Sequence, residues 1–264
     1  MSLICRLMLM NLLAGSLALS QAPQEQSYFR QAEVHEAEGK IQIVANSPRP
    51  LAQVLDALQQ KYGWVVDYED PRFISKVDMV QPTAPATQIL PGGGVFRVEF
   101  PSNLEEEKIL EMVVASYNQS NNPGRFELRK SDQDKFVVVG LQARDSQGRL
   151  SRQKPLFDVP ITVKKIKRNS SDTLKLICQT LAKRQGIAIT LGVMPTSLLG
   201  HSEIEVGGTH LAARELLAQS LTLPGHRLYW RLLFEPSSKG YWLDIHLARD
   251  KNAPSSAHQR FSNE

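Results

Sequence analysis

Cysteine is scarce in this chain of 264 residues, which has only Cys5 and Cys178. Cys5 lies in a segment that we expect to be removed, and the single remaining thiol cannot form an intramolecular disulfide. A small scaffold held by disulfides is therefore excluded. A hydrophobic content of 42% predicts packed cores instead, and the length is sufficient for two compact domains.

Charge of one sign is not concentrated either. The net charge is +4 and the pI is about 9.0, whereas nucleic-acid-binding proteins usually gather basic residues into one patch. The densest basic run comprises Lys164, Lys165, Lys167 and Arg168, which a strand would divide between two faces. We predict no nucleic-acid partner. We interpret the run as a solvated strand edge that discourages sheet pairing, with contact to an anionic surface as the alternative.

Long hydrophobic runs are missing as well. The apolar stretch Leu7–Leu19 is too short for a membrane span. It follows a basic start, Met1–Arg6, and precedes small residues, which is typical of a secretory signal peptide. We predict a signal peptide over residues 1–22, cleaved after Ser20 or Ala22, and a periplasmic or secreted protein with no membrane span after its removal. An uncleaved N-terminal anchor is the alternative.

Two segments of the chain, Asn46–Val66 and Asn169–Ile189, align without a gap. Both have apolar residues at helical spacing, polar residues that can cap the start of the helix and a glycine, Gly63 or Gly186, just beyond its end. Each segment is followed by a strand, a second helix and a hairpin. We therefore predict an α+β fold of two tandem β-α-β-β-α-β-β modules, each packing two helices on its own small mixed sheet.

The repeat also sets the expected boundaries. The first module covers residues 39–143 and the second covers 155–248. A polar linker, 144–154, separates them, and segments 23–38 and 249–264 have the composition of flexible tails. Because each module is expected to have its own sheet, one continuous sheet through both halves would count against this organisation and against any family and role inferred from it.

The order of elements resembles the secretin and TonB short N-terminal domain, a periplasmic α/β domain that precedes secretin pores and TonB-dependent receptors. The matching residues are Pro50–Leu58 and Gly63–Val66 in the first module, and Ala212–Leu217 and the Tyr229–Ile245 hairpin in the second. The resemblance implies docking onto an envelope protein, such as a component of a secretion or TonB-type system. We expect this docking role without a channel.

Residues that often carry chemistry have no catalytic pattern in this sequence. Cys178 lies on the apolar face of its predicted helix, where a buried core thiol is expected rather than a nucleophile. Asp67, Glu69 and Asp70 are interpreted as solvated turn residues, with acid–base chemistry or calcium binding as alternatives. No pair of histidines has the spacing of a zinc-binding helix; the six are His35, His201, His210, His226, His246 and His258. We expect no cofactor, no metal and no enzymatic activity.

Aromatic residues on the last predicted hairpin form the best candidate partner surface. They are Tyr229, Trp230, Tyr241 and Trp242, and such residues are enriched at interfaces, although packing in the core or between modules is the alternative. The predicted function is an exported, non-catalytic protein-interaction module. A small-molecule-binding protein or hydrolase with a cleft between the modules is the second hypothesis, and assembly into a homo-oligomer remains open.

Overall fold

The computed structural model describes residues 31–80, 90–131 and 135–249. The predicted signal peptide and His258 lie outside these residues. The α-helices are α1 (Pro50–Tyr62), α2 (Glu106–Gln119), α3 (Ser170–Gln185), α4 (Thr196–His201) and α5 (Ala213–Ser220), and the 3₁₀ helices are η1 (Lys76–Asp78) and η2 (Leu156–Asp158). The strands are β1 (Glu33–Ala37), β2 (Lys40–Ala45), β3 (Val66–Glu69), β4 (Met79–Val80), β5 (Leu90–Pro91), β6 (Phe96–Pro101), β7 (Arg125–Lys130), β8 (Phe136–Arg144), β9 (Leu150–Arg152), β10 (Pro160–Asn169), β11 (Ile189–Leu191), β12 (Glu203–Ala212), β13 (Leu228–Glu235) and β14 (Gly240–Leu247).

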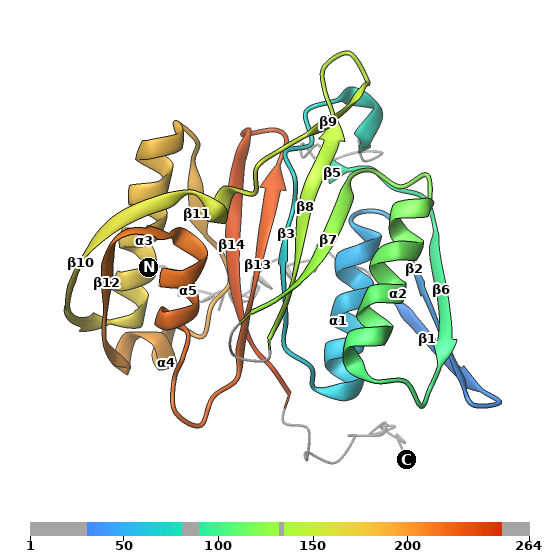
Figure 1. Cartoon of the computed structure of the whole chain (residues 1–264), viewed down its shortest axis with the longest axis horizontal. Coiled ribbons are helices and arrows are strands. Elements are labelled where there is room, and N and C mark those ends of the chain that lie inside the picture. Colours follow the sequence, from blue (N-terminus) through green and yellow to red (C-terminus); the bar gives the residue numbers. More distant parts are fainter. Residues whose placement is uncertain (1–30, 81–89, 132–134, 250–264) are drawn as a thin grey trace, which may run out of the picture.

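A seven-stranded sheet runs through the middle of the molecule (Figure 1). Its order is β11-β14-β13-β3-β8-β7, and β9 pairs with β8. Strand β3, from the first half of the chain, pairs in parallel with β8 on one side and with β13, from the second half, on the other. The prediction of two separate small sheets is therefore wrong. The physical reason is that a strand can pair along both of its edges. Strand β8 occupies one edge of β3, and β13 pairs with the other, which joins the halves in one sheet.

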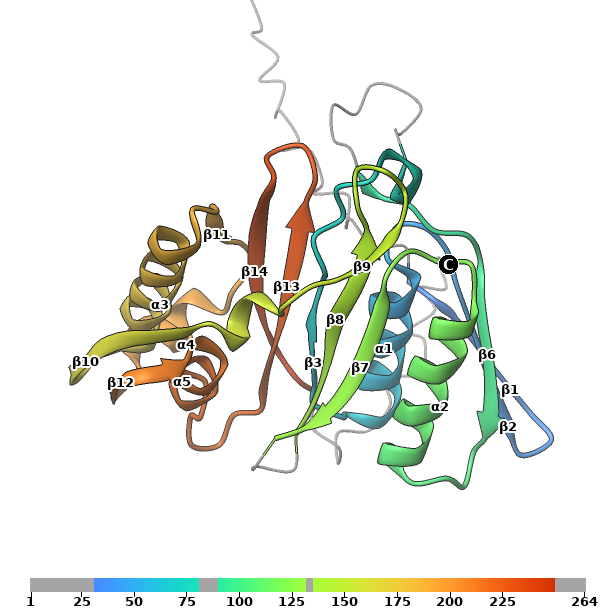
Figure 2. The same ribbon diagram turned by 45° about the horizontal axis from the view of Figure 1, so that its top comes forward.

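The helices cover opposite faces of this sheet. Helices α1 and α2 lie between the sheet and a three-stranded outer sheet, β1-β2-β6, whereas α3 and α5 lie between the sheet and the two-stranded ribbon β10-β12 (Figures 1 and 2). Neighbouring residues of β13 confirm this arrangement. Arg231 bonds Asp56 of α1, while the Trp230 ring lies against Arg214 of α5, as expected from alternation along a strand.

The strands of each half pair in a common pattern. An antiparallel outer pair, β2–β6 or β10–β12, leads into and out of the helices. A parallel pair, β3–β8 or β11–β14, and an antiparallel hairpin, β7–β8 or β13–β14, form the inner sheet. Five α-helices with sheets of mixed strand orientation confirm the predicted α+β class.

Local signals explain where the first helix of each half ends and where α3 begins. The polar cap predicted for α1 is wrong, because its N-cap residue is Arg49, whose side chain makes no capping hydrogen bond. Asn169 caps α3, because its side chain accepts a hydrogen bond of 2.7 Å from the Asp172 N–H. Gly63 and Gly186 end α1 and α3 in the left-handed conformation, at φ 64° and 63°, which glycine adopts without a steric cost. These are the two glycines that the aligned segments predict.

Two segments expected to be irregular contain strands. The predicted linker, 144–154, includes β9, which pairs antiparallel with the end of β8, and Gln153 bonds the backbone of Arg72. Strand β1 lies within the predicted flexible segment 23–38 and pairs with β2 through a tight turn at Glu38 and Gly39. Backbone pairing therefore orders polar sequences whose composition alone indicated loops.

Candidate functional site

The junction of β3 and β13, here called the seam, carries buried charged residues. Its central ion pair joins Arg49 Nε to Asp70 Oδ2 at 2.6 Å, and the two side chains are 5% and 0% exposed. The Asp70 carboxylate also accepts hydrogen bonds from the Tyr68 hydroxyl, at 2.6 Å, and from the Phe234 N–H, at 3.0 Å. Three residues therefore converge on one carboxylate, and one of them, Phe234, comes from the second half of the chain.

Arg231 binds α1 to the seam from the α1 face of the sheet. Its guanidinium donates to Asp56 Oδ1 at 2.7 Å and to the Gln59 side chain and the Val66 carbonyl. The residue is only 2% exposed. Because a planar guanidinium offers donors in a fixed geometry, Arg231 satisfies groups on a helix and on the neighbouring strand β3 together.

Arg214 makes the corresponding contacts on the α5 face. It lies 2.7 Å from Glu69 Oε2 and 3.0 Å from Asp158 Oδ1. Glu69 is fully buried and also accepts from the Leu156 N–H. Burial raises the pKa of Glu69, and the nearby Arg214 opposes this shift. The expectation that Glu69 and Asp70 are solvated turn residues is therefore wrong, because both are enclosed where the two halves meet.

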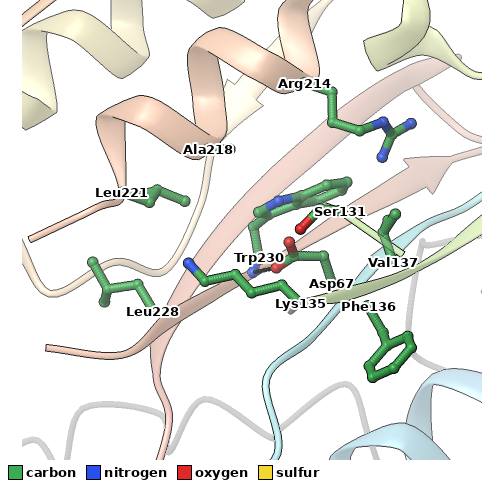
Figure 3. A pocket seen from close by; sticks show the side chains of 10 residues that line it. All are labelled: Asp67, Ser131, Lys135, Phe136, Val137, Arg214, Ala218, Leu221, Leu228 and Trp230. Carbon is green, nitrogen blue, oxygen red and sulfur yellow. Dashed lines mark hydrogen bonds between the residues drawn. The ribbon is translucent and has the colours of Figure 1, made fainter. Parts of the chain in front are cut away.

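Asp67 borders a small cavity beside the seam (Figure 3). The cavity has a volume of about 30 Å³, and Lys135, Arg214 and Trp230 also line it. Asp67 accepts a hydrogen bond of 2.9 Å from the Trp230 N–H, and desolvation raises its pKa to about 6. Nη1 of Arg214 is buried and has no hydrogen-bond partner among the residues that the structure describes. This volume accommodates a water molecule but not an organic substrate.

The four aromatic residues of the predicted partner surface divide between the two faces of the hairpin. Trp230 and Tyr241 are 2% and 3% exposed and belong to the core. Trp242 is 42% exposed, and Tyr229 is half-buried. The two tryptophans lie on opposite faces because Trp230 pairs with Ile245 and Trp242 pairs with Leu233. Trp242 and part of Tyr229 are therefore accessible, whereas Trp230 and Tyr241 pack inside.

The accessible half lies on the α1 side of the sheet, and we call Tyr229, Trp242, Asp244 and His246 the Trp242 face. The rings of Tyr229 and His246 stack at a centroid distance of 5.1 Å, and Arg231 lies 4.8 Å from the Tyr229 ring. Burial, together with the nearby Arg231, lowers the pKa of His246. Next to this face, an open hollow is lined by Gln59, Gln60, Tyr229, Leu247 and Arg249.

Metal-binding and nucleophilic chemistry find little support in the described residues. Cys178 is 2% exposed, and burial raises its pKa to about 12, which confirms a core thiol. His201 bonds the Ser197 carbonyl within α4, and His210 lies on β12. Across residues 31–80, 90–131 and 135–249, no three His, Cys, Asp or Glu side chains are grouped to hold a metal ion.

The sequence indicated the hairpin aromatics but not the arginines of the seam. Arg49, Arg214 and Arg231 occur singly, without a motif, and their carboxylate partners lie 21 to 175 positions away. The one available signal was the group of three acidic residues at the end of β3. Acidic residues that follow a buried strand require cationic partners when they are enclosed.

Comparison with known proteins identifies no relative: no family model, curated protein or solved structure matches the chain. Within the described part of the chain, none of the helices is both long enough and apolar enough to cross a membrane.

Proposed function

We propose that the chain is an exported, non-catalytic protein-interaction protein of the cell envelope, built from two copies of a fold related to the secretin and TonB short N-terminal domain. The common pairing pattern supports the duplication. In each half, an antiparallel outer pair precedes a parallel inner pair and a hairpin. The halves share one sheet, so this proposal differs from the independent modules that the sequence predicts.

The Trp242 face carries the docking proposal. A tryptophan that is 42% exposed lies on a strand whose other face is buried against α3 and α5. Its neighbours Asp244 and His246 supply polar groups around it. Interfaces commonly combine an aromatic anchor with a polar rim. The partner we propose is an envelope protein that buries Trp242 as such an anchor.

A cleft enzyme remains the second hypothesis and has weaker support. That hypothesis requires a pocket between the halves with converging polar groups. At the seam, the described charged residues are bonded to one another, and the cavity beside them measures about 30 Å³. The arrangement favours a structural junction over a substrate site.

Affinity capture from the native envelope, followed by mass spectrometry, tests the docking proposal. We expect wild-type protein to recover secretin or TonB-system components, and Trp242→Ala to reduce their recovery by about tenfold or more, because buried tryptophans dominate many interfaces. Met112→Ala is the matched control, because Met112 is an exposed apolar residue on α2, 37% accessible. Equal recovery by both variants would argue against the Trp242 face, and a co-purified metabolite would favour the cleft hypothesis.

A further inference from the structure

Two edge strands of opposite charge lie at opposite ends of the molecule. Strand β1 borders the outer sheet β1-β2-β6, and β10 borders the ribbon β10-β12 (Figures 1 and 2). Strand β2, which corresponds to β10 in the first half, has β1 and β6 as neighbours. Strand β10 pairs on one side only, with β12. Within the described residues, the second edge of β10 is thus unpaired.

Alternate peptide groups on these edges face outward and can accept another strand. On β10 this holds for the regular stretch Ile166–Asn169, because register shifts on both sides of Val163 interrupt the ladder before it. Ser170 N–H donates to the Ser202 carbonyl at 2.9 Å, so alternate residues of β10 bond β12 and Lys167 faces away from it. On β1, the tight turn closes at the pair Ala37 and Lys40. Alternation from that pair directs the peptide groups of Val34 and Glu36 away from β2.

Side chains on the β10 edge are basic. The predicted solvation of this run is confirmed, because Lys164, Lys165 and Lys167 are exposed on β10. The Lys167 side chain is 70% exposed and lies 2.5 Å from Glu203 on β12. The neighbouring Ile166 is 44% exposed. The edge therefore offers positive charge beside an uncovered apolar residue.

Side chains on the β1 edge are acidic. Glu33 and Glu36 are 68% and 53% exposed and contact His35 and Lys61, respectively. Val34 is 38% exposed between them. Like charges on facing strands oppose pairing, and opposite charges favour it. Pairing of β10 with β10, or of β1 with β1, is therefore disfavoured, whereas pairing of β1 with β10 is selected.

We infer that β1 of one chain adds to the open edge of β10 in a second copy of this chain. The two edges occupy different ends, so the contact is head-to-tail and leaves one free β1 and one free β10 after each addition. The assembly therefore extends as an open chain unless the rotation between successive copies closes it into a ring. A single strand pair forms a small interface, so the association is weak and depends on concentration and salt. It requires neither export nor an envelope partner.

Sedimentation velocity and light scattering of the purified full chain test this inference. We expect the average mass to rise with concentration up to about 0.5 mM, as for weak interfaces. We also expect it to fall when NaCl increases from about 50 mM to about 500 mM, which shortens the Debye length to about 4 Å.

Charge reversal separates the β1–β10 contact from other contacts. Lys165→Glu with Lys167→Glu, or Glu33→Lys with Glu36→Lys, should each weaken self-association by about tenfold. Mixing the two double variants should restore it, because each then meets an edge of opposite charge. Circular dichroism checks that both variants keep the fold, and Met112→Ala serves as the unaffected control.

Three outcomes would overturn the inference. The first is a wild-type chain that stays monomeric throughout the concentration series. The second is association that persists in both charge-reversal variants and is lost in Trp242→Ala, which would place the contact on the Trp242 face. The third is two folded reversal variants that each dissociate but do not associate when mixed.

Discussion

The seam and the cores on either side of it are held together by different forces. In the cores, fully buried apolar residues such as Leu55 on α1 and Leu181 on α3 pack the helices on the sheet. In the seam, directed bonds connect the halves: the paired Arg49 and Asp70 bond the Phe234 backbone, and Arg231 bonds Asp56. Apolar burial stabilises without choosing a direction, whereas an ion pair requires particular atoms. The cores therefore stabilise each half, and the seam determines how the halves join.

The free edge of β7 shows the reverse arrangement. The outward peptide groups of Phe126 are occupied by the Asn118 side chain, which accepts from the Phe126 N–H at 2.9 Å and donates to its carbonyl at 2.8 Å. A covered edge cannot extend the sheet at that point. Polar side chains therefore act on this sheet in two ways. At the seam they bond β13 beside β3, and on β7 they block the pairing of a further strand.

The largest expected effect comes from removing the carboxylate at the centre of the seam. Asp70→Ala leaves Arg49 buried without its partner, and it leaves the Tyr68 hydroxyl and Phe234 N–H without their acceptor. We expect the free energy of unfolding to fall by about 3–5 kcal/mol, as when one member of a buried ion pair is removed. Urea denaturation monitored by circular dichroism measures the change.

A double-mutant cycle provides the control for Asp70→Ala. Arg49→Met in the Asp70→Ala background removes the unpaired charge, so we expect this second change to cost less than Arg49→Met alone. Strictly additive losses would mean that the two side chains do not act as a pair. Directed bonding would then not distinguish the seam from the cores.

Local structure was predictable from the sequence because its signals are local. Gly63 and Gly186 mark the ends of α1 and α3, and the apolar spacing between cap and glycine predicts both helices. The continuous sheet was not predictable in this way. It joins β3 to β13, so that Asp67 and Trp230 bond across 163 positions of sequence. No pattern within either segment indicates that the other is its neighbour.

The candidate surface was predictable only in part. Alternation along two paired strands predicts that the hairpin aromatics divide between two faces, once the register is known. Which face is covered depends on where α5 packs, and in the structure it packs against Trp230 rather than Trp242. The position of a helix that precedes the hairpin in sequence is a tertiary property, so the exposed tryptophan could not be identified beforehand.

An intermediate effect on stability is expected from replacing Asp67, whose pKa is raised to about 6 by desolvation. The folded chain binds this proton more tightly than the unfolded chain, so ionisation of Asp67 lowers stability as pH rises from about 4 to about 6. Asp67→Asn keeps an acceptor for the Trp230 N–H and does not titrate. We expect the variant to gain about 2–3 kcal/mol over wild type by the upper end of this window.

Urea titrations of both proteins between pH 4 and pH 7 check the Asp67 prediction, because the difference between them cancels groups that titrate in both. Below about pH 4 the two stabilities should converge, since the carboxyl is then protonated in the folded and unfolded states. A difference that stays constant across the series would mean that Asp67 does not titrate above its usual range. The cavity would then be hydrated well enough to hold a charged carboxylate.

The smallest effect on stability is expected from breaking an exposed ion pair whose geometry is similar to that of the buried Arg49–Asp70 pair. Lys40 Nζ lies 2.8 Å from Glu99 Oε1, close to the 2.6 Å of the Arg49–Asp70 pair, but its side chains are 64% and 46% exposed. Water solvates both charges in the unfolded and folded states, so Glu99→Gln should leave the urea midpoint unchanged. If Glu99→Gln instead destabilises the chain as much as Asp70→Ala, then enclosure is not what makes the seam pairs strong. Burial would then not explain why the seam pairs contribute more to stability than ion pairs elsewhere in the molecule.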